Sequence, residues 1–346
     1  MDLLFTVIQV SLAMAALSFL AAFCLVVERW HRNRIRERER ARIDQLIVLG
    51  LEYAEMPEHH SALLQQIGKR DRRLLLQAFA ETIPKIRGEL ADQMVELMRS
   101  LGVVEAGLQQ LKSWRWWRRM EACEKLQWHP QERVIQALHD ALDDSVFPVR
   151  VEAARALAAM GAAPEIPVLL AKLASAGHRS LRVAELFRTL GDTHTEQMIS
   201  ALLSNTNDAA RLILIDALSQ STTPEVIDAF RQIFGTASAD VKSAVLRAIA
   251  STQDPAAWPM VEAGLQDSSP LVRAQAATTA GSFADTRAIP LLKQLLHDFE
   301  WWVRYSAGES LTRLKGPGLL ALWDAAAGEG LAAEIAGGLL REKGLA

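Results

Sequence analysis

Asp267-Ser-Ser-Pro-Leu-Val-Arg273, followed by Ala-Gln-Ala-Ala-Thr-Thr-Ala280 and Gly281, is a unit from which the architecture of this chain can be deduced. An Asp before an apolar run is a helix-start signal, because its side-chain oxygen can accept hydrogen bonds from exposed backbone N–H groups. The Ala-Ala pair lets two helices approach closely, and a glycine is expected to end the helix. An aliphatic segment with helical spacing, such as Ile289 to Leu296, accompanies each unit. The unit therefore predicts a helix, a short turn and a second helix.

The unit recurs along the chain at a nearly constant spacing. Basic residues separated by 29 to 32 positions run through its last two-thirds: Arg118, Arg150, Arg182, Arg211, Lys242, Arg273 and Arg304. A fixed period of about 20–50 residues is typical of stacked repeats. We therefore predict an all-α fold, in which about seven helical hairpins form an α-solenoid over residues 103–316.

These units resemble HEAT repeats, the armadillo-like α-solenoid family in which a turn Asp and a basic residue six positions later form a characteristic pair. The resemblance implies a stack of hairpins that serves as a binding surface. We expect the recurring polar residues to be structural, with each basic side chain bonding carboxylates and carbonyls of its own and adjacent turns. A binding role for the row is the alternative. This ladder comprises Asp144, Arg150, Arg182, Asn205, Arg211, Lys242, Asp267, Arg273, Asp298 and Arg304.

The N-terminal segment predicts a membrane anchor. Leu3 to Val27 carries no formal charge, and as a helix it would extend about 37 Å, enough to cross a bilayer core of about 30 Å. A secretory signal peptide is the alternative, but such a peptide has a basic start, whereas this chain begins Met-Asp. Residues 1–27 are therefore expected to form a single transmembrane helix.

A basic segment, residues 28–42, follows the predicted anchor. It contains seven Arg and three Glu, and basic residues beside a membrane span remain on the cytoplasmic side. We expect part of this segment to contact the membrane surface, through Arg29, Trp30, Arg32, Arg34 and Arg36. The chain is thus predicted to be a single-pass protein of the bacterial inner (cytoplasmic) membrane, with its C-terminal domain in the cytoplasm.

Two further segments flank the repeats. Residues 43–102 have helical patterns without the register of the ladder, which predicts a helical cap or divergent repeats. Gly316-Pro-Gly318 interrupts the pattern at the other end. Residues 317–346 are expected to close the stack with two capping helices, Leu319 to Ala327 and Leu331 to Leu340.

The best candidates for partner binding are aromatic and basic residues gathered in two places. Trp301 and Trp302 precede Arg304 in the way that Trp116 and Trp117 precede Arg118. These tryptophans either fill interfaces between repeats or anchor a partner, since Trp is a favoured residue at binding hot spots. The candidates are Trp114, Arg115, Trp116, Trp117, Arg119, Trp128, Trp301 and Trp302.

The sequence offers little that indicates catalysis. It contains no nucleophile elbow, no Walker loop and no dinucleotide-binding glycine motif. The histidines lack metal-ligand spacing and are expected at the surface or in caps, His129 among them. The two cysteines, Cys24 and Cys123, imply no disulfide framework. We therefore expect no catalytic residue, no metal, no cofactor and no enzymatic activity.

These features favour a scaffold that holds another protein at the cytoplasmic face of the bilayer. The Trp-Trp-x-Arg units and the anchor resemble bacterial HEAT-repeat proteins that accompany membrane glycosyltransferases of exopolysaccharide systems, and this implies a glycosyltransferase partner. Two alternatives remain. One is a HEAT-like enzyme resembling bilin lyases or DNA glycosylases, although the net charge of −3 argues against nucleic acid. The other is a sensor of anionic lipid or nucleotide, acting through Arg115, Arg118 and Arg119.

Overall fold

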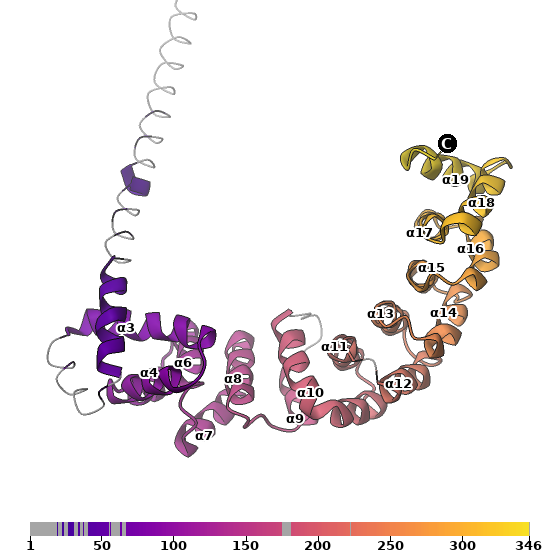
Figure 1. Ribbon diagram of the computed structural model, residues 1–346. Helices are drawn as coiled ribbons and strands as arrows, with labels where there is room; N and C mark the ends of the chain where they lie inside the picture. The colour runs from indigo at the N-terminus through magenta and orange to yellow at the C-terminus, as the bar shows by residue number, and fades with distance from the viewer. Residues whose placement is uncertain are drawn as a thin grey trace, which may run out of the picture. The chain divides into compact units, whose positions relative to one another are not determined.

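The computed structural model describes residues 19, 23, 27–30, 34, 37, 41–54, 56, 63, 67–174, 181–221 and 223–345 (Figure 1). Every regular element in these residues is a helix, so the predicted all-α class is confirmed there. The predicted anchor, residues 1–27, lies almost wholly outside them, as do Arg32 and Arg36. Among the helices that are described, none is long and apolar enough to cross a bilayer.

The chain divides into two compact units, residues 1–134 and 135–346. The boundary falls inside the segment predicted as repeats. The first unit contains a helix through residues 41–54 and ends within the first turn of α7. Its remaining helices are α3 (Lys69–Thr82), η2 (Ile83–Lys85), α4 (Glu89–Ser100), α5 (Val103–Gln110) and α6 (Trp116–Leu126), with α7 spanning Glu132–Ala141.

The second unit is built from helical hairpins. Its earlier helices are α8 (Phe147–Ala159), α9 (Ile166–Leu173), α10 (Leu181–Ser204), α11 (Asp208–Leu218), α12 (Pro224–Phe234) and α13 (Ala239–Ile249). Its later helices are η3 (Pro255–Ala257), α14 (Trp258–Leu265), α15 (Pro270–Phe283), η4 (Thr286–Ala288), α16 (Ile289–Leu295), α17 (Trp301–Arg313), α18 (Lys315–Ala326) and α19 (Leu331–Glu342).

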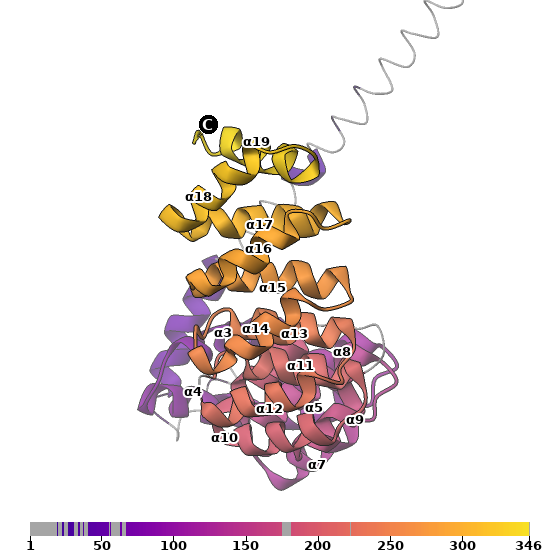
Figure 2. The same ribbon diagram turned by 90° about the vertical axis from the view of Figure 1, so that its right-hand side faces the viewer.

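The hairpins of this second unit stack in two layers. One layer contains α11, α13, α15 and α17, and each of these helices packs against the next. The other layer contains α14, α16 and α18, which also contact in order. Figure 1 shows the first layer on the inner side of the curve, and Figure 2 shows the last hairpins stacked one above another. This arrangement within the second unit is that of an α-solenoid.

Small residues allow the inner helices to approach closely, as the sequence predicted. In α15, Ala276, Ala277 and Ala280 are buried, and in α8 the equivalent Ala153 and Ala154 are buried as well. Burying these side chains costs no rotamer entropy, so the interface is formed at a low entropic cost. The continuous core of the second unit therefore lies between neighbouring repeats.

Two local expectations are corrected by the structure, and a third is refined. Gly281 does not end its helix: it lies inside α15, which continues to Phe283 and ends on Ala284 in the left-handed region at φ 52°. The two helices expected around Arg182 and Met198 are both present, and they join end to end within α10 at a kink where the backbone of His194 is not helical. Gly316-Pro-Gly318 lies in the first turn of α18 rather than in a break before it.

The position of Gly281 gives a testable prediction about the α15–α17 interface. A Cβ at residue 281 would lie 2.8 Å from Ser310 Cβ and 3.0 Å from Ser310 Cα in α17, so the helices would have to separate. We expect Gly281→Val to lower the free energy of unfolding by about 2 kcal/mol, which is typical of overpacking. Gly235→Val is the control, since nothing lies within 4 Å of a Cβ there. Equal denaturation midpoints for the two variants, measured on the full chain in mild detergent, would contradict this packing.

Candidate functional site

The recurring polar residues connect successive turns of the second unit. Arg273 on α15 donates from Nη1 to the carbonyl oxygens of Asp267 and Ser268, both at 2.9 Å, in its own turn. It also donates from Nε and Nη2 to the carboxylate of Asp298 in the next turn, at 2.7 and 3.0 Å. One guanidinium therefore joins the turns before α15 and α17, in the bidentate geometry that suits an arginine and a carboxylate.

Lys242 on α13 makes the preceding connection. Its Nζ lies 2.7 Å from Asp267 Oδ2 in the turn before α15. Arg150 on α8 donates to the carbonyl oxygens of Asp144 and Lys172, at 2.9 and 3.1 Å. Arg304 on α17 bonds the carbonyls of Asp298 and Phe299, at 2.7 and 3.0 Å. These basic side chains thus occupy hydrogen-bonding positions within the turns of the stack.

The Asp and Asn side chains of the turns also accept hydrogen bonds from the backbone. Asp144, Asp267 and Asp298 each accept a hydrogen bond from the N–H two residues later, at 2.8 to 2.9 Å, and Asn205 does the same at 2.8 Å. The acceptor therefore closes a short turn and bonds the residue just before the helix, rather than capping the first turn of the helix itself. This geometry refines the expected helix-start role of these residues.

Hydrogen bonds lower the pKa of two aspartates in the ladder. Burial acts to raise the pKa of Asp298, but hydrogen bonds from Arg273 and from the Glu300 N–H outweigh it, so the pKa lies below the ordinary value of 3.8. Asp267 behaves alike: its burial is outweighed by Lys242 and the Ser269 N–H. A lowered native pKa stabilises the fold above the unfolded value, and the stabilisation is lost as pH falls through the native pKa.

Two basic residues expected in the ladder, Arg182 and Arg211, do not make the contacts that Arg273 makes. Arg182, near the start of α10, is 62% exposed, and its closest ionic partner is Glu152 at 4.0 Å. The Nε of Arg211 on α11 is buried without a hydrogen-bond partner among the described residues. The turn that precedes Arg182 lies outside the described residues.

In the first unit the register of the ladder falls on Arg119 rather than Arg118. Arg119 Nη1 donates to the carbonyl oxygens of Ser113 and Trp114, at 2.8 and 3.3 Å. Arg304 bonds the residues six and five positions before it in the same way. The aromatic segments therefore align as Trp114-Arg-Trp-Trp-Arg-Arg119 and Phe299-Glu-Trp-Trp-Val-Arg304, and Arg119, a candidate for partner binding, occupies the ladder position.

The first aromatic segment presents its rings to solvent. Trp114 is 81% exposed, Trp116 40% and Trp117 47%. Trp117 meets Trp114 and Trp116 edge to face, with centroids 6.5 and 6.2 Å apart, and the Arg115 guanidinium lies 4.8 Å from the Trp114 ring. Trp116 and Trp117 are therefore partly covered and partly open to solvent. We call Trp114, Trp116 and Trp117 the Trp114 cluster.

The second aromatic segment is exposed in the same manner at the start of α17. Trp301 is 57% exposed and Trp302 49%, and Trp301 stacks on Tyr305 with centroids 5.2 Å apart. Phe299 is 98% exposed, although the sequence analysis did not single it out. The sequence does distinguish Phe299, because the units of Asp144 and Asp267 have serine at the same turn position. We call Phe299, Trp301 and Trp302 the Phe299 cluster.

Trp128 and His129 differ from expectation because the chain buries them after α6. Trp128 is half-buried, and its Nε1 is buried without a hydrogen-bond acceptor in the described part of the chain. His129, expected at the surface or in a cap, is 0% exposed, and neither ring nitrogen has a hydrogen-bond partner among the described residues. Burial and the charge of Arg99 lower the pKa of His129 to about 4, against a smaller opposing effect of Glu105. His129 is therefore a neutral core residue.

The described residues contain no group of three or more His, Cys, Asp or Glu side chains that could hold a metal ion. The most prominent features of these residues are instead the two exposed aromatic clusters and a basic pocket in the first unit, lined by residues of α3, α5 and α6. Interaction with another molecule is the chemistry that such features support.

Comparison with known proteins agrees with this architecture. Residues 104–186 and 227–312 match a family model described as HEAT repeats, and together they make up just under half of the chain. This match supports assignment of the repeat region to the HEAT-repeat family. No curated protein matches the chain at a significant level.

Several solved structures are similar to this chain. Human deoxyhypusine hydroxylase in complex with glycerol is 21% identical, with a TM-score of 0.32, over 70% of this chain and 97% of that one. Kap121p is 12% identical, with a TM-score of 0.44, over 83% of this chain and 39% of that one. Kap121p bound to Pho4p is 13% identical, with a TM-score of 0.37, over 84% and 42%. This chain thus spans about two fifths of the Kap121p chain.

Proposed function

We propose that this protein is a non-catalytic scaffold that binds a partner protein through its exposed aromatic clusters. The exposure of the Phe299 cluster is the observation that carries the proposal. Trp301 and Trp302, at the start of α17, are each about half exposed, and Phe299, in the turn before that helix, is almost fully exposed. Large aromatic side chains kept in water at one place are typical of protein-binding surfaces, because burying them in a complex contributes much of the affinity.

The proposal extends to the place and the nature of the partner. The uncharged segment Leu3 to Val27, followed by the basic residues 28–42, supports a single anchor in a bacterial inner membrane with the repeats in the cytoplasm. An anchored scaffold meets membrane partners at a high effective concentration. The Trp-Trp-x-Arg motif occurs twice, ending at Arg119 and at Arg304, and its resemblance to HEAT-repeat proteins of exopolysaccharide systems supports a membrane glycosyltransferase as the partner.

Affinity purification of the tagged full chain after mild detergent extraction tests this function. We expect mass spectrometry to identify one stoichiometric membrane enzyme with the wild type. We expect its recovery to fall about tenfold or more with the Phe299→Ala/Trp301→Ala/Trp302→Ala variant, because truncating hot-spot aromatics costs about 2 kcal/mol or more.

The control for this experiment is Leu320→Ala/Leu331→Ala. These leucines are 63% and 51% exposed on α18 and α19, outside both clusters, and they test for a general loss of surface hydrophobicity. Equal recovery of the partner with the aromatic and the leucine variants would refute binding through the Phe299 cluster. Purification of the wild type without any partner would contradict the scaffold function.

A further inference from the structure

The first unit contains an open pocket of about 740 Å³ whose walls are strongly basic. Residues of α3, α5 and α6 form it, and its charged side chains are Arg72, Arg73, Arg115, Arg118, Lys125 and Glu121. Five of these six side chains are basic, so the pocket has a formal charge of +4, whereas the whole chain has −3. Positive charge is thus concentrated here against the balance of the molecule, which favours an anionic ligand.

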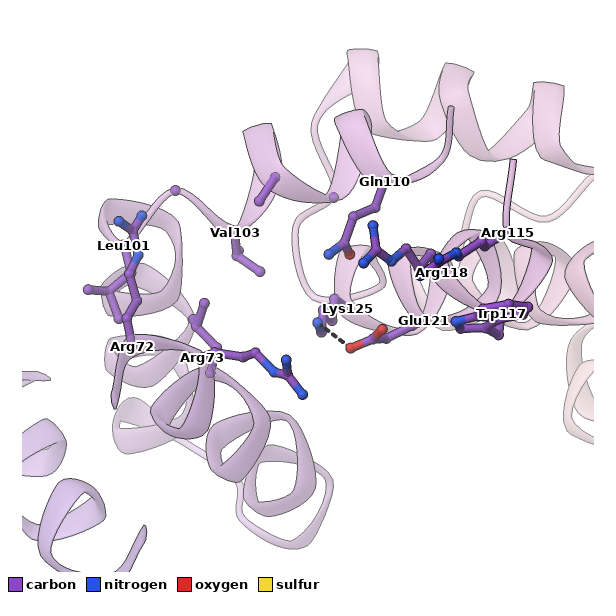
Figure 3. A pocket seen from close by; sticks show the side chains of 14 residues that line it. Arg72, Arg73, Leu101, Val103, Gln110, Arg115, Trp117, Arg118, Glu121 and Lys125 are labelled. Atoms are coloured by element: carbon purple, nitrogen blue, oxygen red, sulfur yellow. Dashed lines mark hydrogen bonds and ion pairs between the residues drawn. The ribbon is translucent and has the colours of Figure 1, made fainter. Parts of the chain in front are cut away.

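Most of this charge is not neutralised by acidic residues in the described parts of the chain. Lys125 pairs with Glu121 at 2.7 Å, which accounts for the one acidic residue of the pocket (Figure 3). Arg72, Arg73 and Arg118 form no ion pair with any residue that the structure describes. Figure 3 shows Arg73 extending from α3 toward α6, and Arg118 beside Gln110 on the other side. Guanidinium groups that have no carboxylate partner are suited to bidentate contacts with phosphate oxygens.

Polar groups at the wall add to this pattern. The Arg115 Nε–H, a hydrogen-bond donor, belongs to the lining and is buried without a partner among the described residues. Helix α6 begins at the pocket, without a side-chain cap and without an acidic residue in its first turn. Helix geometry leaves the N–H groups of Trp116 and Trp117 without a carbonyl partner within α6, and the positive end of the helix dipole favours an anion.

We propose that this pocket binds a ligand that carries phosphate groups, with Arg73 of α3 and Arg118 of α6 contacting the phosphates from opposite walls. The indole of Trp117 lines the same pocket and offers a flat surface to a ring attached to the phosphate. A volume of about 740 Å³ is within the range of small-molecule sites. The ligand is either a soluble phosphorylated molecule or a phospholipid headgroup. The inference does not depend on the identity of the partner protein.

Calorimetric titration of the full chain in a nonionic detergent tests the pocket with two probes. Sodium pyrophosphate represents the soluble source, and soluble short-chain phosphatidic acid represents the lipid source. Saturable binding of pyrophosphate alone assigns a soluble ligand, and binding of phosphatidic acid, with or without pyrophosphate, assigns a headgroup. Absence of saturable binding for both probes would overturn the proposal.

Charge-reversal variants connect binding to the pocket. We expect Arg73→Glu/Arg118→Glu to weaken binding about a hundredfold, because charge-assisted hydrogen bonds are replaced by repulsion. Both side chains are exposed, so folding should be retained, and circular dichroism verifies this. Arg247→Glu/Arg313→Glu makes the same charge change at exposed positions of α13 and α17 and is expected to bind as the wild type does. If the two variants weaken binding equally, the attraction is general and the proposed site is wrong.

Arg118→Gln, which removes charge without reversing it, is expected to give an intermediate loss of affinity.

Discussion

Replacing Arg273 by alanine is expected to destabilise the second unit by about 3 kcal/mol. The variant removes both hydrogen bonds to Asp298, whose side chain is only 7% exposed, and both bonds to the carbonyls of its own turn. Loss of Arg273 leaves a buried carboxylate without its ion-pair partner, and this costs about 3–5 kcal/mol for a fully buried pair. The lower part of that range applies because Arg273 is itself 17% exposed. Urea denaturation of the full chain in mild detergent measures the change.

An exposed ion pair provides the control for Arg273. Arg188 on α10 lies 2.8 Å from Asp216 on α11, but the two side chains are 42% and 39% exposed. Such pairs contribute about 0.2–1 kcal/mol, so Arg188→Ala should have a small effect. Equal effects of the two alanine variants would show that the buried ladder contributes no more than a surface pair. Hydrogen exchange should also show faster exchange in α15 and α17 for Arg273→Ala alone, since repeats interact mainly with their neighbours.

The second large effect is a loss of stability between neutral pH and about pH 4, which we assign to His129. Its native pKa is about 4, whereas its ordinary value is 6.5. Within that window the unfolded chain binds a proton that the folded chain does not, so the free energy of unfolding falls as pH falls. The difference amounts to about 3 kcal/mol at the acidic end, at about 1.4 kcal/mol for each pH unit. The aspartates of the ladder act below 3.8, outside this window.

Denaturation of His129→Leu across this pH range measures the effect. At neutral pH the variant should be as stable as the wild type or more stable, since neither ring nitrogen has a hydrogen-bond partner to lose among the described residues. Toward pH 4 it should retain most of the stability that the wild type loses. His297→Leu removes an exposed histidine and is expected to keep the steep dependence. A wild-type slope in His129→Leu would mean that another group causes the loss.

Much of the fold could be predicted because the repeat is a local pattern. The motif from Asp267 to Arg273 determines a turn, a helix and the hydrogen bond from Arg273 to the Asp267 carbonyl. All three involve residues that are close in sequence. The period then implies that each basic residue reaches the next turn, as Arg273 reaches Asp298. The same reasoning gave the capping helices at the C-terminus, which the structure has as α18 and α19.

The errors arose where tertiary packing decides the outcome. Two adjacent arginines, Arg118 and Arg119, and a serine in place of the turn Asp left the register of the first unit undetermined by local pattern. Gly281 is a common helix-ending residue, but here the close approach of Ser310 from another repeat requires it inside α15. The burial of His129 likewise depends on helices distant in sequence. No periodicity in the sequence separates buried from exposed tryptophans.

The basic pocket illustrates the same limit. Arg73 and Arg118 belong to segments 45 residues apart, and Arg73 lies in the segment that the sequence described only as a cap or divergent repeats. The sequence pointed to Arg115, Arg118 and Arg119 as an anion sensor, and the structure divides that group. Arg115 and Arg118 line the pocket, whereas Arg119 bonds the carbonyls of its turn.

Site-specific photo-crosslinking in living cells tests the scaffold function most directly. A photoreactive phenylalanine analogue is placed at Phe299, which is 98% exposed, and at Leu320, which is 63% exposed and lies outside the aromatic clusters. We predict that position 299 forms one discrete adduct with an integral membrane enzyme and that position 320 does not. The same adduct at both positions, or no adduct at position 299, would contradict a partner-binding role for the exposed aromatic residues.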